Sequence, residues 1–323
     1  MKLVITGATG FLGRHFLARL VKATDLQIFC VARSLSSIQE EDHPGVQWLK
    51  GDLCSLPFCR ELVTEKDVIL HLAHSSHPLT SELDLAGDIV SNVLPSTTLL
   101  QAVLEVGSGP HIVFASSGGA TYGEGVSGRP FTEEDQCVPV SGYGIQKLMI
   151  EHYIRILARR GFLTASVLRI TNAYGTLLPV NRRQGLIGVA MERMLKGRPI
   201  PVFGSLGNVR DYIHLDDILE CVHITLFRRN EFEIFNVGAG KGTSVSEVFA
   251  LLERVTGLKA LVEPVTTFGG PGLVKCCMVS LEKAERELNW RPKIDLEAGI
   301  AKMYNDYKGQ RHNLTTNRAK DGM

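Results

Sequence analysis

Two residues that could move a proton, Tyr143 and Lys147, stand four positions apart in the chain. Residues four apart on a helix share one face, so the ammonium of Lys147 can lie beside the phenol. A tyrosine normally titrates near ~10, and a nearby cation favours the phenolate and lowers that pKa. The pair therefore predicts a phenol that accepts a proton near neutral pH.

A glycine-rich turn opens the chain, with Gly7, Gly10 and Gly13 in the spacing Gly-x-x-Gly-x-x-Gly. Glycines permit a tight turn and let backbone amides approach a pyrophosphate at a helix N-terminus. The turn separates a short apolar segment, 3–6, from residues 11–21, whose apolar positions follow a helical period. This strand–turn–helix pattern predicts a dinucleotide site. Together with the tyrosine it indicates redox chemistry on a carbon that bears a hydroxyl.

Residues at the ends of later strands indicate how the nucleotide and substrate would be held. An acidic residue after the second expected strand, 26–32, would bind the ribose 2′-hydroxyl of NAD. This chain has Arg33 there, which could pair with the 2′-phosphate of NADP or be a solvated loop arginine. Asp52 could face the adenine or end a turn. Ser116 ends the expected strand 111–116 and Ser117 follows it, and we favour Ser117 as the hydroxyl that shares the substrate proton with Tyr143.

Further polar residues lie in the second half of the chain. Arg169, Asn172 and Arg210 complete the polar inventory, and Arg210 could clamp a diphosphate through two hydrogen bonds. The alternative for Arg210 is an internal ion pair with Asp211 or Asp216.

Composition limits the possible partners. The 323 residues are 44% hydrophobic with a formal net charge of +1, so no global field attracts nucleic acid or an anionic membrane. We find no signal peptide and no apolar run approaching the ~20 residues that span a bilayer, and we expect a cytoplasmic protein. His71, His74 and His77 are spaced by three along a strand-to-loop passage, which does not bring them together, and we expect no metal site.

The order of the expected elements predicts an α/β fold, a doubly wound parallel (Rossmann) sheet with a smaller C-terminal substrate-binding lobe. Strands at 68–73 and 166–170 alternate with helices at 92–106 and 147–160. We assign residues 1–176 to the dinucleotide-binding domain, with a return segment at 211–240. Residues 177–210 and 241–307 form the lobe, including a loop at 197–207 and a helix at 245–256 capped by Ser244. Residues 308–323 form a mobile tail.

With these motifs in place, the chain resembles the extended short-chain dehydrogenase/reductase family. More narrowly, it is similar to the nucleotide-sugar epimerase/dehydratase group typified by UDP-glucose 4-epimerase. The likeness runs from residue 2 to about residue 292 and includes the segments 71–73, 92–93, 168–175, 210–217 and 288–292.

The resemblance implies roles for individual residues. Tyr143 would be the acid/base, Lys147 would hold the nicotinamide ribose, and Ser117 would bind the sugar hydroxyl. Asn172 and Arg210 would contact the diphosphate of a UDP-linked sugar, and Gln184 would line the pocket. The residues implicated in holding NAD, or NADP, are Gly7, Gly10, Phe11, Leu12, Gly13, Arg33, Asp52, Leu53, Leu72, Ala73, Asn92, Tyr143 and Lys147. The helices at 92–106 and 147–160 would pair across a two-fold axis into a homodimer.

The chain departs from the family pattern by one residue inserted between Ser117 and Tyr122, and by a missing arginine that affects substrate affinity or identity. The stretch Gly270–Val274 lacks the arginine that the family uses as a second phosphate clamp, and Lys275 would replace it only as a point charge. Gly118 and Gly119 stand where dehydratases carry acid/base groups, so we favour a 4-epimerase of polysaccharide biosynthesis. An NADPH-dependent keto-sugar reductase and a non-catalytic dinucleotide sensor remain alternatives.

Overall fold

The computed structural model describes residues 1–23, 26–36, 38, 45–78, 80–81, 83–125, 129–182, 184–265 and 274–320, without the side chains of residues 23 and 310–320. Within these residues, seven parallel strands form the main sheet in the order β10-β6-β5-β4-β1-β2-β3. They are β1 (Lys2–Thr6), β2 (Gln27–Ala32), β3 (Val46–Lys50), β4 (Val68–His71), β5 (His111–Ser117), β6 (Thr164–Ile170) and β10 (Phe232–Val237). The strand order reverses at β1, so the crevice between β1 and β4 is the expected ligand site.

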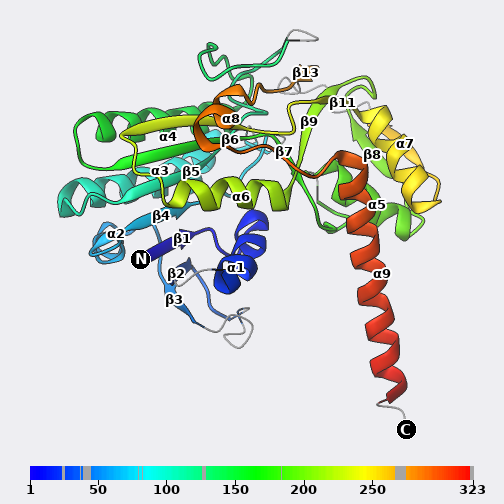
Figure 1. The fold of residues 1–323 in the computed structure, drawn as a ribbon, viewed down its shortest axis with the longest axis horizontal. Helices are drawn as coiled ribbons and strands as arrows, with labels where there is room; N and C mark the ends of the chain where they lie inside the picture. The colour runs from blue at the N-terminus through cyan, green and yellow to red at the C-terminus, as the bar shows by residue number, and fades with distance from the viewer. Residues whose placement is uncertain are drawn as a thin grey trace.

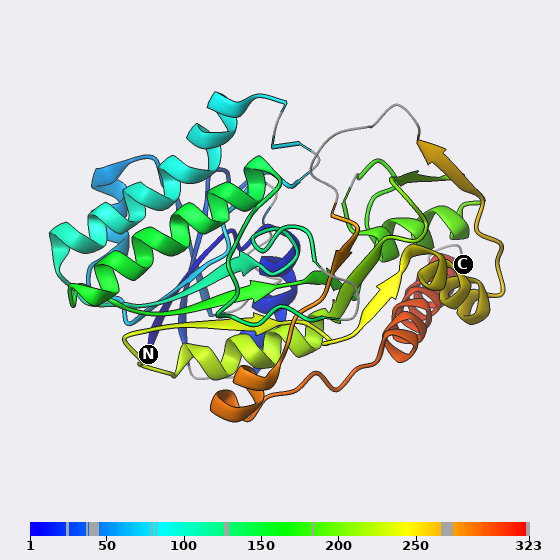
Figure 2. The same ribbon diagram turned by 90° about the horizontal axis from the view of Figure 1, so that it is seen from above.

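Helices cover both faces of this sheet, as Figure 2 shows. One face carries α1 (Phe11–Ala23), α6 (Leu215–Leu226) and α8 (Glu282–Leu288), and the other carries α2 (Leu56–Val63), α3 (Leu85–Val106) and α4 (Gly142–Arg159). Successive strand residues alternate between faces: Leu3 and Ile5 pack toward α1 and α6, while Val4 packs toward α2, α3 and α4. The predicted fold class is confirmed.

A smaller lobe lies at one end of the sheet (Figure 1). Its helices are α5 (Leu186–Leu195), α7 (Val245–Thr256) and α9 (Leu296–Lys320), which share a separate apolar core. Its strands are β7 (Asn172–Tyr174), β8 (Ile200–Phe203), β9 (Val209–His214), β11 (Gly242–Ser244), β12 (Val262–Val265) and β13 (Cys276–Cys277). Helix α7 has the predicted bounds, and Ser244 caps it in a reciprocal bond with Glu247.

Three expectations about the second half need correction. The expected loop at 197–207 contains β8, because Ile200–Phe203 pairs with β12. The return segment starts later than residue 211, because β9 joins β7, β11 and β13 rather than the main sheet. From residue 308 the chain continues α9 as far as Lys320, since extending an existing helix adds one hydrogen bond per residue fixed. The mobility of this tail stays a prediction.

Helix α3 is an exception to our expectation that no apolar run is long enough to span a bilayer. By length and composition it is long and apolar enough to cross a membrane, and no other helix of the described residues passes that test. It packs against α2 and α4, and its Asn92 and Ser96 side chains are buried and hydrogen-bonded. Its outer face carries the exposed Ile89, Val90 and Leu94. The high apolar content therefore comes from a core helix that is apolar on its outer face too.

Candidate active site

The glycine turn lies at the switch point between β1 and β4. Gly7 has φ +72°, and a Cβ there would come within 2.7 Å of the Ala73 backbone nitrogen. The Gly10 amide donates to the Gly7 carbonyl at 2.9 Å, and a Cβ on Gly10 would meet only that carbonyl oxygen. Helix α1 begins at the next residue, Phe11. The open backbone before a helix N-terminus fits a dinucleotide pyrophosphate.

Close packing at the start of α4 brings Tyr143 to the end of β5. Ser141 caps α4 by accepting a bond from the Gly144 amide at 3.3 Å. A Cβ on Gly144 would lie 2.3 Å from the Ala120 carbonyl oxygen, so only glycine lets this turn rest on the loop after β5. The Ser117 side chain lies close enough to the Tyr143 phenol to lower its pKa.

Lys147 is 3% exposed and donates to the Ala115 carbonyl at 2.8 Å, with its nitrogen 5.8 Å from the centre of the Tyr143 ring. The predicted lowering of the Tyr143 pKa is wrong for this structure. Burial raises that pKa to about 12, although the Ser117 side chain acts in the opposite direction. Burial also lowers the pKa of Lys147 to about 7, against the effect of Glu151. Desolvation disfavours both charged forms.

Glu151 and Arg169 form a buried ion pair beneath this site. Their side chains are 3% and 5% exposed, and the Arg169 Nη2 to Glu151 Oε2 distance is 2.8 Å. Ser116 donates its hydroxyl to Glu151, which leaves Ser117 as the serine beside Tyr143. We did not single out Glu151, although a carboxylate four residues after Lys147 lies on the same helix face.

Both the oxygen and the nitrogen of the Asn92 amide form hydrogen bonds with other residues of the protein. Its Oδ1 accepts from the Ser75 amide at 2.6 Å and from the Ser75 hydroxyl at 2.9 Å, and its Nδ2 donates to Ser76 and Asp88. Asn92 is 1% exposed. It therefore holds the loop after β4, and its predicted direct contact with the dinucleotide is unsupported by these bonds.

At the end of β2, Arg33 is exposed and makes no hydrogen bond or ion pair within the described part of the chain. Asp52 accepts from the Cys54 amide at 2.9 Å, as a turn aspartate does. Leu53 is buried. The glycine turn is bordered by residues of intermediate exposure: Phe11, Leu12, Leu72 and Ala73. Arg33 is thus an exposed polar group, without a bonded partner among the described residues, at the adenosine end of the expected site.

The expected diphosphate ligands are only partly available. Arg210 donates to the backbone carbonyls of Val209, at 2.9 Å, and Val274, so it neither points free nor pairs with Asp211 or Asp216. Asn172 donates to the Asp211 carbonyl at 2.9 Å.

Gln184 is exposed just before α5. Residues 270–273 of the stretch without the family arginine lie outside the described residues. The Lys275 backbone amide donates to the Glu124 carboxylate at 2.8 and 3.0 Å.

A histidine that we had weighed only as a metal ligand also contacts Tyr143. The rings of His74 and Tyr143 lie 4.9 Å apart at 86°. Burial, followed by the charge of Lys147, lowers the pKa of His74 well below its usual value. Within the described residues, no group of three or more histidine, cysteine, aspartate or glutamate side chains could hold a metal ion.

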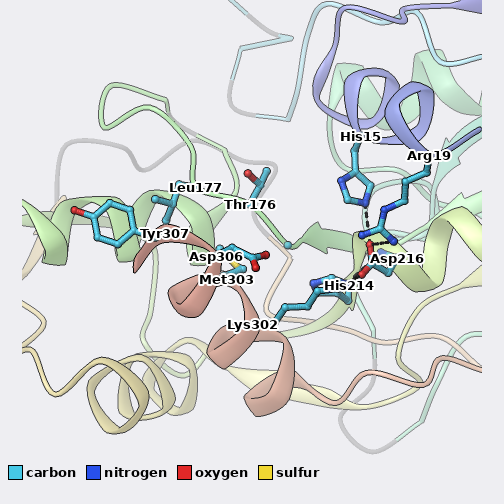
Figure 3. A pocket seen from close by; sticks show the side chains of 11 residues that line it. His15, Arg19, Thr176, Leu177, His214, Asp216, Lys302, Met303, Asp306 and Tyr307 are labelled. Atoms are coloured by element: carbon cyan, nitrogen blue, oxygen red, sulfur yellow. Dashed lines mark hydrogen bonds and ion pairs between the residues drawn. The ribbon is translucent and has the colours of Figure 1, made fainter. Parts of the chain in front are cut away.

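A separate hollow of about 200 Å³ lies between α1 and α9. Figure 3 shows His15, Arg19 and Lys302 converging on Asp216. Burial alone would raise the pKa of Asp216, but the hydrogen bonds of His15 and Lys302 outweigh it and lower that pKa well below its usual value. None of the predicted site residues lines this hollow. The cluster connects the lobe's α9 to the main domain.

Comparison with known proteins identifies the family. The model of the NAD dependent epimerase/dehydratase family matches residues 3–238. The chain belongs to this family. A dTDP-4-dehydro-6-deoxyglucose reductase of Escherichia coli is 28% identical over 310 residues, covering 93% of this chain and 95% of the relative.

Two solved structures extend the likeness over almost the whole fold. The UDP-glucose 4-epimerase of Thermotoga maritima with UDP-glucose has a TM-score of 0.85 and 29% identity, covering 96% of this chain and 99% of the other. The UDP-glucose 4-epimerase of Thermus thermophilus in complex with NAD gives the same TM-score, identity and coverage.

Proposed function

We propose that the protein is a nucleotide-sugar 4-epimerase that uses NAD and acts through a transient 4-keto sugar. The observation that carries this proposal is the placement of Tyr143 near Ser117, at the carboxyl edge of a sheet whose glycine turn fits a dinucleotide. The similarity to UDP-glucose 4-epimerases with UDP-glucose and with NAD supports a UDP-linked sugar as the substrate.

In this proposal the chain positions the sugar and moves one proton. Tyr143 accepts the proton of the C4 hydroxyl and later returns it, while Ser117 holds that hydroxyl in place. NAD, when bound, accepts the hydride from C4 and returns it. Lys147 would hold the nicotinamide ribose through its ammonium. Gly118 and Gly119 carry no group that could transfer a proton, which disfavours the elimination of water by a dehydratase.

A keto-sugar reductase is the second candidate, and two observations favour it. Arg33 is exposed at the end of β2, where it could pair with the 2′-phosphate of NADP. The relative from Escherichia coli is named as a reductase of a 4-dehydro sugar.

Release of the bound dinucleotide separates the two candidates. The purified protein is denatured, and any NAD or NADP is identified by mass spectrometry. Stoichiometric NAD, with conversion of UDP-glucose to UDP-galactose followed by NMR, is expected for the epimerase. An empty site that binds NADPH reversibly, without interconversion of the two sugars, would transfer the proposal to the reductase.

We also propose a homodimer through α3 and α4. Exposed apolar side chains of both helices, including Ile89, Leu94, Met149, Tyr153 and Ile156, surround a groove of about 500 Å³. A second copy would cover this face with its own α3 and α4. Such burial would account for the apolar outer surface of α3.

A further inference from the structure

Two histidines after β4 have opposite environments. His71 is 3% exposed, and both its ring nitrogens are bonded, Nδ1 to the Thr6 hydroxyl at 2.7 Å and Nε2 to the Ser96 hydroxyl at 2.9 Å. His74 has one bonded nitrogen, Nε2, which lies 3.3 Å from the Ser76 hydroxyl. Its Nδ1 is buried and meets no hydrogen-bond partner in the described part of the chain. His71 is a structural histidine, whereas His74 has a free ring atom.

The hydrogen bonds around Ser76 determine which nitrogen of His74 carries the proton. The Ser75 backbone amide can only donate, so the Asn92 atom that it contacts at 2.6 Å is the carbonyl oxygen. The amide nitrogen of Asn92 therefore donates to the Ser76 oxygen at 3.1 Å. The Ser76 hydroxyl donates its single proton to the Asp88 carboxylate at 3.2 Å. No proton of Ser76 remains for His74.

The Nε2 atom of His74 must consequently be the donor to Ser76. His74 is neutral at physiological pH, because burial and the nearby Lys147 ammonium lower its pKa well below the usual value. A neutral imidazole with a proton on Nε2 has a lone pair on Nδ1. That lone pair is an acceptor without a donor, which is unfavourable in a buried position.

The His74 ring, which carries this free acceptor, lies near two other polar residues of the site. The His74 ring packs against the Tyr143 ring, and the Lys147 ammonium is close enough to affect the His74 pKa. Lys147 has three N–H donors and uses one of them on the Ala115 carbonyl. Lys147 has spare donors and His74 has a spare acceptor, a combination that is complementary to a hydroxyl, which both accepts and donates.

We propose that His74 is a ligand-binding residue of this site, whose Nδ1 accepts a hydrogen bond from a hydroxyl of the bound ligand. The hydroxyl belongs either to a ribose of the dinucleotide or to the sugar that Tyr143 acts on. This inference rests on the proposed function, because it requires a ligand at Tyr143. It adds an acceptor to the donors that Lys147 supplies.

Two substitutions distinguish the effect of the His74 acceptor atom on binding from the effect of its aromatic ring. His74→Phe keeps an aromatic ring against Tyr143 and removes both nitrogens. His74→Asn removes the ring and places an amide oxygen near the position of Nδ1. His71→Phe is the matched control, since it removes the two hydrogen bonds of a structural histidine; we expect it to lower Tm more than His74→Phe, which removes only the bond to Ser76.

Binding is measured by calorimetry with NAD alone and with UDP-glucose on NAD-loaded protein, in a Tyr143→Phe background that prevents turnover. We expect His74→Phe to weaken one of the two affinities about 3- to 10-fold, the range for one neutral hydrogen bond, and His74→Asn to restore most of it. Weaker NAD binding would assign the hydroxyl to the ribose, and weaker UDP-glucose binding alone would assign it to the sugar.

Two results would overturn the inference: both affinities of His74→Phe within twofold of the parent, or equal losses in His74→Phe and His74→Asn. A parent protein that binds neither NAD nor UDP-glucose would instead contradict the proposed function. The two failures are therefore distinguishable.

Discussion

Replacing Glu151 by glutamine tests whether the buried ion pair supports the Tyr143 site. The substitution keeps the shape of the side chain but removes the charge that faces Arg169, at 2.8 Å in a pair whose side chains are 3% and 5% exposed. Removing one partner of a buried pair leaves the other charge without compensation, which costs about 3–5 kcal/mol. The Ser116 hydroxyl can still donate to the remaining amide oxygen, so the loss comes mainly from Arg169.

The expected change in melting temperature follows from the size of the chain. With an unfolding entropy of about 2.1 cal/mol/K per residue over 323 residues, Glu151→Gln should lower Tm by roughly 4–7 °C. The matched control is Glu297→Gln, because Glu297 also binds an arginine through two bonds, to Arg254 Nε at 2.9 Å and Nη2 at 2.6 Å. That pair is 61% and 51% exposed, and exposed pairs contribute about 0–1 kcal/mol.

The same substitution should also affect ligand binding through Lys147. Glu151 raises the Lys147 pKa against the larger effect of burial, so its loss should leave less of the ammonium form near neutral pH. Differential scanning calorimetry gives Tm, and titration with NAD at pH 6 and pH 8 gives the affinities. We expect the affinity of Glu151→Gln to fall more at pH 8. Equal Tm values for Glu151→Gln and Glu297→Gln would refute the reasoning about burial.

Three further predictions concern the phenol, the lysine and the dimer. Tyr143→Phe should lower turnover about 10²–10⁴-fold; a loss below tenfold would exclude Tyr143 as the acid/base. Lys147 has a folded pKa of about 7 against 10.5, so the unfolded chain binds more protons between these values and stability should rise with pH. Urea midpoints should therefore increase from pH 7 to pH 9 in the wild type more than in Lys147→Met, and parallel changes would contradict this. Ile156→Glu should give a monomer in light scattering, whereas Leu261→Glu, at another exposed apolar position, should not; a dimeric Ile156→Glu protein would place the interface elsewhere.

The parts that the sequence could predict are those that depend on neighbours along the chain. The glycine turn, the alternation of buried residues in β1 and the Ser244 cap of α7 each follow from local rules. The contact of Tyr143 with Ser117 was also accessible, because the carboxyl end of β5 and the start of α4 meet at one edge of a parallel sheet. Two short motifs, one at the carboxyl end of β5 and one at the start of α4, were sufficient for that prediction.

The sequence could not predict which hydrogen bonds the polar side chains form, because the partners are often far apart in the sequence. Arg210 binds the carbonyl of Val274, which is 64 residues away, and no spacing rule indicates this partner. Asn92 has the residue type of a ligand-binding amide, yet its donors and acceptor are used by Ser75, Ser76 and Asp88. A residue type predicts what a side chain can bind, and only the fold decides what it does bind.

The distinction between epimerase and reductase depends on the proton that Tyr143 carries before reaction. With a pKa of about 12, the phenol is protonated near neutral pH. A reductase can use this form directly, because it donates a proton to the oxygen of the keto-sugar that receives the hydride. An epimerase begins by removing a hydroxyl proton, so the Tyr143 pKa has to fall when the ligands bind. Lys147 lies 5.8 Å from the phenol ring and can lower that pKa only while it is charged, that is, below its own pKa of about 7. An epimerase built on this site therefore needs a cation or a hydrogen-bond donor, from Lys147 or from a bound ligand, to stabilise the phenolate, a requirement that a reductase does not share.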